Sequence, residues 1–180
     1  MAASAMDLTC KGAVGITGTA SKTGVEFESV DFDLAHTFSS SLADGTGANQ
    51  ANQVYQDSVS AIADAETSYD LAGTLVDEFG GTITFTKIKG IVLLNKSTTA
   101  SVLQIGGGTG LDGTNAFDTW ITSTAADGSE GVLVRAGGLF VLWAPDATAY
   151  AVAAGTGDIL VIKEKSTLAA VFELSIIGVV

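Results

Sequence analysis

The sequence predicts an all-β protein, an antiparallel β-sandwich whose most economical form is a jelly roll. Charged residues make up only 16% of the chain, too few for long amphipathic helices, which normally expose Glu, Lys and Arg. Val, Ile, Thr and aromatic residues are plentiful and favour strands. Apolar segments recur roughly every 8–15 residues between turn signals, which is the spacing of a sandwich.

The first predicted strand covers residues 8–17. Leu8, Cys10, Val14 and Ile16 share one parity, which is the period-2 pattern of a half-buried strand. Polar residues occupy the other parity, and a turn follows at residues 20–24.

The next strand covers residues 25–38, and its apolar residues change parity near Ser29. A shift of one residue moves every side chain to the opposite face, so we expect a bulge or bend there. Residues 39–52 are polar and Gly-rich and predict a long exposed loop. Residues 54–62 predict a short strand, with a weakly amphipathic helix as the alternative.

Further strands follow in the C-terminal two-thirds. Residues 88–94 are apolar on both parities near their end, which predicts a strand covered on both faces. Residues 134–143 predict two strands that meet at Gly137 and Gly138. The only proline, Pro145, ends the second of these strands, and another strand begins near Tyr150. The last two predicted strands, 158–163 and 170–177, form a candidate hairpin.

The length of 180 residues predicts one domain, 1–180. Within it, residues 1–60 form an N-terminal arm, strands and loop, and residues 61–180 form the core sandwich. Residues 1–7 lack the basic and apolar regions of a secretory signal. Apolar runs are far shorter than the roughly 20 residues that span a bilayer. We therefore expect synthesis in a cytoplasm.

The charge balance argues against two classes of partner. Eight basic and 20 acidic residues give a net charge of −12. Nucleic acids and anionic membrane surfaces attract basic proteins, so we expect neither as a partner. The acidic surface serves solubility or meets a basic partner.

No residue pattern predicts catalysis. His36 is the only histidine and lies on the buried parity of its strand, so a Ser-His-Asp arrangement or a Cys10–His36 pair is disfavoured. The acidic pairs Glu26/Glu28 and Asp31/Asp33 have the separation of glycosidase carboxylates, but they alternate with apolar residues, as on a solvated strand face. We expect no catalytic residues.

Ligand sites are equally weakly indicated. The glycine cluster at residues 106–110 lacks the Lys and the following helix of a phosphate loop. Zinc has no credible ligand set, and we expect no cofactor. Trp120, Trp143 and Tyr150 are candidates for a sugar-stacking platform, although core packing is favoured because Trp143 lies within an apolar strand. The remaining acidic candidates for a structural calcium ion lack EF-hand spacing and are Asp112, Asp118, Asp127 and Glu130.

Several segments resemble structural proteins of tailed phages and prophages. They are turn-and-strand patterns at residues 42–51, 69–80, 83–89, 95–97, 136–138, 145–150 and 176–178. The chain departs from the family pattern at Ala136, where the family has proline, and at Ala149, where it has glycine. The resemblance spans roughly residues 42–178.

This resemblance implies a virion protein, most plausibly a capsid decoration (cement) protein on the head surface. Such proteins form β-rich homotrimers at local threefold positions and bridge neighbouring major capsid proteins. The polar loop and the N-terminal arm would grip the coat lattice and become ordered on binding. The alternative is a glycan-binding or adaptor β module of a phage tail or fibre. A carbohydrate-active enzyme that uses the acidic pairs ranks last.

Overall fold

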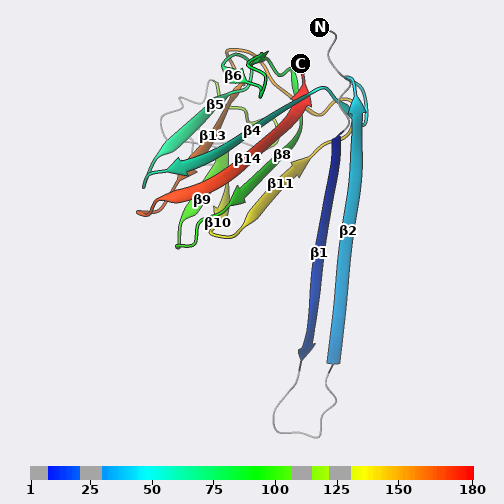
Figure 1. Cartoon of the computed structure of the whole chain (residues 1–180), viewed down its shortest axis with the longest axis vertical. Helices are drawn as coiled ribbons and strands as arrows, with labels where there is room; N and C mark the ends of the chain where they lie inside the picture. The colour runs from blue at the N-terminus through cyan, green and yellow to red at the C-terminus, as the bar shows by residue number, and fades with distance from the viewer. Residues whose placement is uncertain (1–7, 21–29, 107–114, 122–130) are drawn as a thin grey trace, which may run out of the picture.

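The computed structural model describes residues 8–20, 30–106, 115–121 and 131–180, with side chains from residue 40 onward. All regular elements in this part of the chain are strands, so the predicted all-β class is confirmed. Two long strands, β1 (Leu8–Ala20) and β2 (Val30–Asp44), form a hairpin that extends away from a two-layered sandwich (Figure 1). We call β1 and β2 the projecting hairpin.

One layer of the sandwich has the strand order β11-β8-β14-β4, with β12 also paired to β8. Alternating residues along these strands supply the core, as in Phe172, Leu174 and Ile176 of β14. The bounds of the strands are β4 (Gln53–Ala61), β8 (Lys87–Asn95), β11 (Leu139–Trp143), β12 (Tyr150–Ala151) and β14 (Ala170–Val179).

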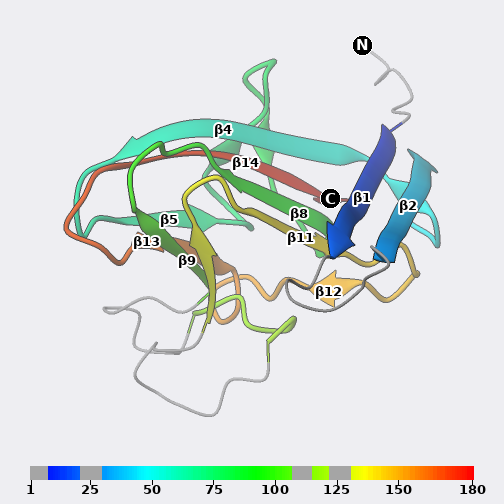
Figure 2. The ribbon, with the colours of Figure 1, turned by 90° about the horizontal axis from the view of Figure 1, so that it is seen from below.

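The other layer has the order β10-β9-β13-β5, and Figure 2 shows it lying across the first layer. Its strands are β5 (Glu66–Asp70), β9 (Val102–Gly106), β10 (Gly131–Arg135) and β13 (Ile159–Glu164). Two short strands, β6 (Leu75–Val76) and β7 (Thr82–Ile83), make a separate ribbon, and β3 (Gln50–Ala51) pairs in parallel with β2. The hydrophobic core lies between the two layers.

The eight long strands from β4 onward alternate between the layers. The first, third, sixth and eighth form one sheet, and the second, fourth, fifth and seventh form the other. Of the strands that follow one another in this series, only β9 and β10 pair within a sheet. The predicted strands at 54–62 and 88–94 are confirmed as β4 and β8, and the helical alternative for 54–62 is wrong.

The predicted C-terminal hairpin is wrong. Both strands exist, but β13 pairs with β5 and β9, whereas β14 pairs with β4 and β8. The connection at 165–169 therefore crosses between the layers. Leu160 of β13 and Phe172 of β14 are both fully buried in the core, so crossing buries their apolar faces between the two sheets.

The predicted long loop at 39–52 is also wrong. Residues 39–44 continue β2; residues 39–42 pair with the first residues of β1, residues 43–44 pair with β3, and only residues 45–49 form a turn. Three serines made this segment look like a loop. A polar segment can still be a strand when the neighbouring strand pairs with its backbone groups. Leu42, in the middle of the predicted loop, is only 1% exposed.

Other expectations fall partly or wholly outside the described residues. They are the turn at 20–24, the parity change near Ser29 and the arm at residues 1–7. The one-domain organisation stays a prediction. Strand β4 falls within the predicted N-terminal part, yet it pairs with β14 in the sandwich.

Candidate functional site

The root of the projecting hairpin is the turn at residues 45–49, where the ribbon meets the sandwich. The backbone N–H of Ala43 donates to the carbonyl of Asn49 (2.9 Å), which closes the turn. The N–H of Asn49 in turn donates to the carbonyl of Pro145 (2.6 Å), in the loop that follows β11. The single proline therefore ends a strand and also presents an acceptor to the root.

Lys89 contacts both the hairpin root and the loop that follows β11. It lies in β8 and is fully buried. Its Nζ donates to the carbonyl of Gly47 (3.1 Å) and to the carbonyl of Asp146. Burial lowers the pKa of the Lys89 ammonium, and the Asp146 carboxylate opposes that shift. One charged group from the sandwich thus binds both the hairpin root and the Pro145 loop.

Residues 144–149, which we call the Pro145 loop, are held in shape by hydrogen bonds to the side chain of Asp146. The carboxylate of Asp146 accepts the N–H groups of Thr148 (2.8 Å) and Ala149 (2.9 Å). These backbone hydrogen bonds hold the pKa of Asp146 below its ordinary value. Hydrogen bonds within the loop therefore fix its shape.

Ala149 carries strain in this loop, because its φ is +49°. Left-handed backbone costs a residue with a Cβ about 1 kcal/mol or more relative to glycine. We expect Ala149→Gly to raise the free energy of unfolding by about 1 kcal/mol, measured by urea denaturation. Ala147→Gly is the control in the same loop; it gives no gain because the φ of Ala147 is not positive. Equal effects of the two changes would refute the strain.

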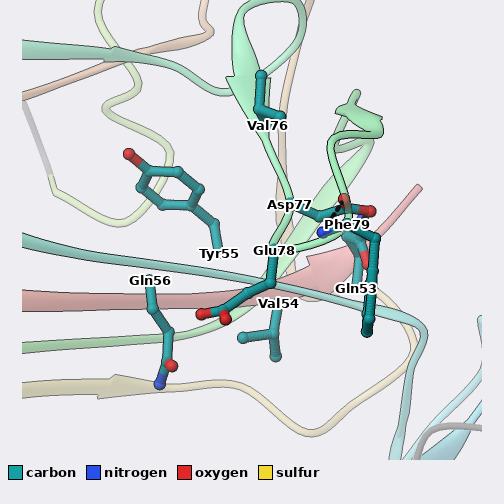
Figure 3. Close-up of a pocket in the computed structure, with 8 residues that line it drawn as sticks. All are labelled: Gln53, Val54, Tyr55, Gln56, Val76, Asp77, Glu78 and Phe79. Atoms are coloured by element: carbon teal, nitrogen blue, oxygen red, sulfur yellow. Dashed lines mark hydrogen bonds between the residues drawn. The ribbon is translucent and has the colours of Figure 1, made fainter.

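A second surface feature is an open groove between β4 and the β6–β7 ribbon, with a volume of about 460 Å³ (Figure 3). One wall is Gln53 to Gln56 of β4, and the other runs from Val76 to Phe79. Glu78 and Gln56 supply polar groups, whereas Val76 is half-exposed. The groove has polar and apolar walls but no nucleophile with an adjacent base.

The turn above the groove displays Phe79, which is 99% exposed. The carboxylate of Asp77 accepts the N–H groups of Phe79 (2.9 Å) and Gly81 (2.7 Å), so the turn is held in shape by hydrogen bonds. The hydrogen bond from Gly81 is the main cause that lowers the pKa of Asp77. Aromatic residues are enriched in protein interfaces, so the exposed Phe79 is a candidate contact for a partner protein.

Tyr55 and Tyr69 near the groove are hydrogen-bond donors rather than reactive groups. Both hydroxyls donate to the Asp57 carboxylate, at 3.3 and 3.2 Å. Burial raises the pKa of Tyr69, and the charge of Asp57 raises it further. Both effects also raise the pKa of Tyr55. The phenols stay protonated, which suits a packing role.

The residues considered for catalysis lie in the projecting hairpin, away from this groove. Cys10 is opposite Ser40, and His36 is opposite Val14. Asp31 and Asp33 pair with Thr19 and Thr17. Register places Cys10 and His36 on one face of the ribbon and the two Asp residues on the other, so the ribbon does not bring all four together. Glu26 and Glu28 lie outside the described residues.

The candidate ligand sites are only partly covered by the structure. Gly106 ends β9 with a φ of +118°, and residues 107–110 lie outside the described part. Asp118 is described, whereas Asp112, Asp127 and Glu130 are not. Among the described residues, no three His, Cys, Asp or Glu side chains lie together as a metal site.

The three candidate aromatic residues of a sugar platform are held by packing. Trp120 lies against Phe140 (ring centroids 5.5 Å apart), and its Nε1 donates to the carbonyl of Phe117 (3.0 Å). Trp120 and Tyr150 both pack on the core. Trp143 is only partly buried and is not part of the core cluster, so the core position expected for it is wrong. It is opposite Gly90, and a Cβ built on Gly90 would approach its ring to 2.8 Å, so the missing side chain there makes room for the indole.

Comparisons with known proteins add little. No protein-family model and no curated protein matches the chain. Among solved structures, the crystal structure of Yersinia pseudotuberculosis-derived mitogen is similar, with a TM-score of 0.33 and 11% identity. The match covers 70% of this chain and 86% of that chain. A likeness at this level carries no argument about function. In the described part of the chain, no helix could cross a membrane.

The sequence reasoning missed Lys89 and Phe79 as functional candidates. A lysine inside a strand predicted to be covered on both faces was a visible signal, because a buried ammonium needs acceptors. The turn that displays Phe79 also has a sequence signature, because Asp77 and Gly80 occupy the first and fourth positions of a β-turn.

Proposed function

We propose that the protein is a non-enzymatic decoration (cement) protein of a tailed-phage capsid. It binds the outside of the icosahedral head and bridges neighbouring major capsid proteins. The observation that carries the proposal is the projecting hairpin, a ribbon of 13-residue pairing that adds no strand to either layer of the sandwich. Such an element is available for contacts outside its own domain, and the resemblance to phage structural proteins supplies the setting.

The order of the eight long strands supports the finer prediction of a jelly roll. A jelly roll has eight strands in two sheets, wound so that successive strands mostly change sheet. The 1-8-3-6 and 2-7-4-5 arrangements of the two layers agree with that winding. We infer a rigid jelly-roll body that holds two contact elements, the Phe79 turn and the projecting hairpin.

A direct test is the binding of the purified protein to mature heads that lack it. Co-sedimentation should show saturable binding with a fixed number of copies per head. A glycan array is the parallel test of the tail or fibre alternative, which the packed positions of Trp120 and Tyr150 do not favour. Failure to bind heads would remove the proposal.

The Phe79 turn is the part of the body best suited to the coat lattice. We expect Phe79→Ser to weaken binding to heads at least tenfold, because exposed aromatic anchors dominate such contacts. Its unfolding free energy should stay within about 0.5 kcal/mol, since the side chain contributes no burial. The matched control is Ile62→Ser, another exposed apolar residue at the opposite end of β4. Equal losses from both changes would contradict the assignment.

A further inference from the structure

The projecting hairpin has one apolar face along its whole length. The antiparallel register places Ile16 opposite Leu34, Gly18 opposite Phe32, and Gly12 opposite Phe38. Every second pair falls on this face, because successive residues of a strand alternate between faces. The complete set of pairs on this face is Leu8/Leu42, Cys10/Ser40, Gly12/Phe38, Val14/His36, Ile16/Leu34, Gly18/Phe32 and Ala20/Val30.

The charged residues in the β1–β2 pairs are Lys11, Asp31 and Asp33, and all three fall on the other face. Lys11 is opposite Ser39, and Asp31 and Asp33 are opposite Thr19 and Thr17. Two copies of a chain with net charge −12 repel each other, and a contact surface without charges adds no further like-charge contacts to that repulsion. The apolar face of the hairpin is such a surface.

At the root of the hairpin, burial distinguishes the two faces of the ribbon. Leu42, on the apolar face, is buried at 1% exposure, while its neighbours Ser41 and Ala43 are exposed. Farther from the root, Figure 1 shows the ribbon extending away from the sandwich. A two-stranded ribbon alone is marginally stable in water and needs packing on its apolar face. The covering surface for the outer part must come from elsewhere.

The length of the hairpin indicates which surface can cover its apolar face. The 13 paired positions span about 44 Å at 3.4 Å per residue. The exposed aliphatic strand of the sandwich, β11, has five residues and spans about 17 Å, less than half of that length. An equally long charge-free surface is available on the apolar face of the same hairpin in another copy.

We infer that copies of this protein associate through the apolar faces of their projecting hairpins, which lie parallel around a shared axis. The inference deepens the proposed function, because the resemblance to decoration proteins implies a homotrimer and the hairpin supplies its contact surface. Closed rotational symmetry brings identical faces together at the same height. The ribbon face has a footprint of roughly 400 Å², about half of what one partner buries in a standard interface.

The native Cys10 is the probe for this arrangement. Parallel packing puts the Cys10 residues of neighbouring copies close together, so a short bismaleimide should link them into covalent pairs at low protein concentration. The matched control is the double variant Cys10→Ser/Ser41→Cys, which moves the thiol to the opposite face of the same ribbon. It should give at least tenfold less cross-linked product.

A charge placed on the apolar face should break the association. We expect Ile16→Asp to weaken self-association at least 100-fold in analytical ultracentrifugation, and Ala13→Asp, on the polar face, to change it less than threefold. Thermal unfolding of the sandwich should be the same for both variants, because neither position is in its core. A monomeric wild type, an oligomer that survives Ile16→Asp, or an oligomer without Cys10 cross-linking would overturn the inference. Head binding by a monomer would leave the proposed function standing, whereas an oligomer that ignores heads would remove only that function.

Discussion

Glu164→Ala should destabilise the folded protein by about 4 kcal/mol, because it leaves several buried donors without an acceptor. Glu164 ends β13 and is fully buried. Its carboxylate accepts the N–H groups of Asp64 (3.2 Å), Val102 (3.2 Å) and Ser166 (2.8 Å), and the hydroxyl of Ser166 (2.5 Å). Three separate connections of the sandwich depend on this one side chain.

The control for Glu164→Ala is Glu173→Ala. Glu173 is half-exposed and forms an ion pair with Lys96 at 2.5 Å. Surface ion pairs contribute about 0–1 kcal/mol, so this change should cost less than 1 kcal/mol. Both values come from urea denaturation at neutral pH. A cost below 1 kcal/mol for Glu164→Ala would contradict the role of Glu164.

The same residue predicts an acid-dependent loss of stability. Burial alone would raise the pKa of Glu164, but the hydrogen bonds from Ser166, Asp64 and Val102 outweigh it and hold the pKa below its ordinary 4.5. A lowered folded-state pKa means that the contribution is complete above about pH 4.5 and is lost as the pH falls through the folded-state value. Glu164→Gln should therefore be less stable than wild type at pH 7, and the gap should narrow in acid. A gap that is constant with pH would contradict this assignment.

Lys89→Met should cost about 2 kcal/mol and loosen the hairpin root. The methionine keeps the length of the side chain but leaves the carbonyls of Gly47 and Asp146 without their donor. Limited proteolysis should cut the variant within residues 45–52 at least ten times faster than wild type, since local opening exposes that turn.

Lys87→Met is the matched control for the root, because Lys87 lies in the same strand and its Nζ donates to the carbonyl of Ala147 (2.9 Å) from an exposed position. It should change stability by less than about 0.5 kcal/mol. Equal proteolysis rates for the two variants would show that Lys89 does not hold the root.

Strand positions could be predicted because alternation is a local property. The alternation of residues 8–17 and the apolar run at residues 88–94 showed such local patterns, and both segments are strands. Residues 39–44 did not, because three serines there resemble a loop until β1 supplies their pairing partners. Pairing within sheets failed for β13 and β14, since two adjacent strands joined by a short turn fit a hairpin and a sheet crossing equally well.

The candidate site was less predictable, because it depends on contacts between distant segments. Glu164 receives a hydrogen bond from Asp64, which is 100 residues away in the chain. Lys89 meets Gly47 across 42 residues and Asp146 across 57. The amphipathic character of the projecting hairpin was partly visible in the alternation of residues 8–17 and 30–38. Its projection away from the sandwich was not, because nothing local distinguishes an internal strand from a protruding one.

The most direct test of the central claim is an image reconstruction of the intact particle that contains this protein. The account predicts its sandwich on the outer surface of the icosahedral head, in contact with neighbouring major capsid proteins, with the projecting hairpins of adjacent copies packed together. Density in the tail, or a particle without the protein, would contradict it.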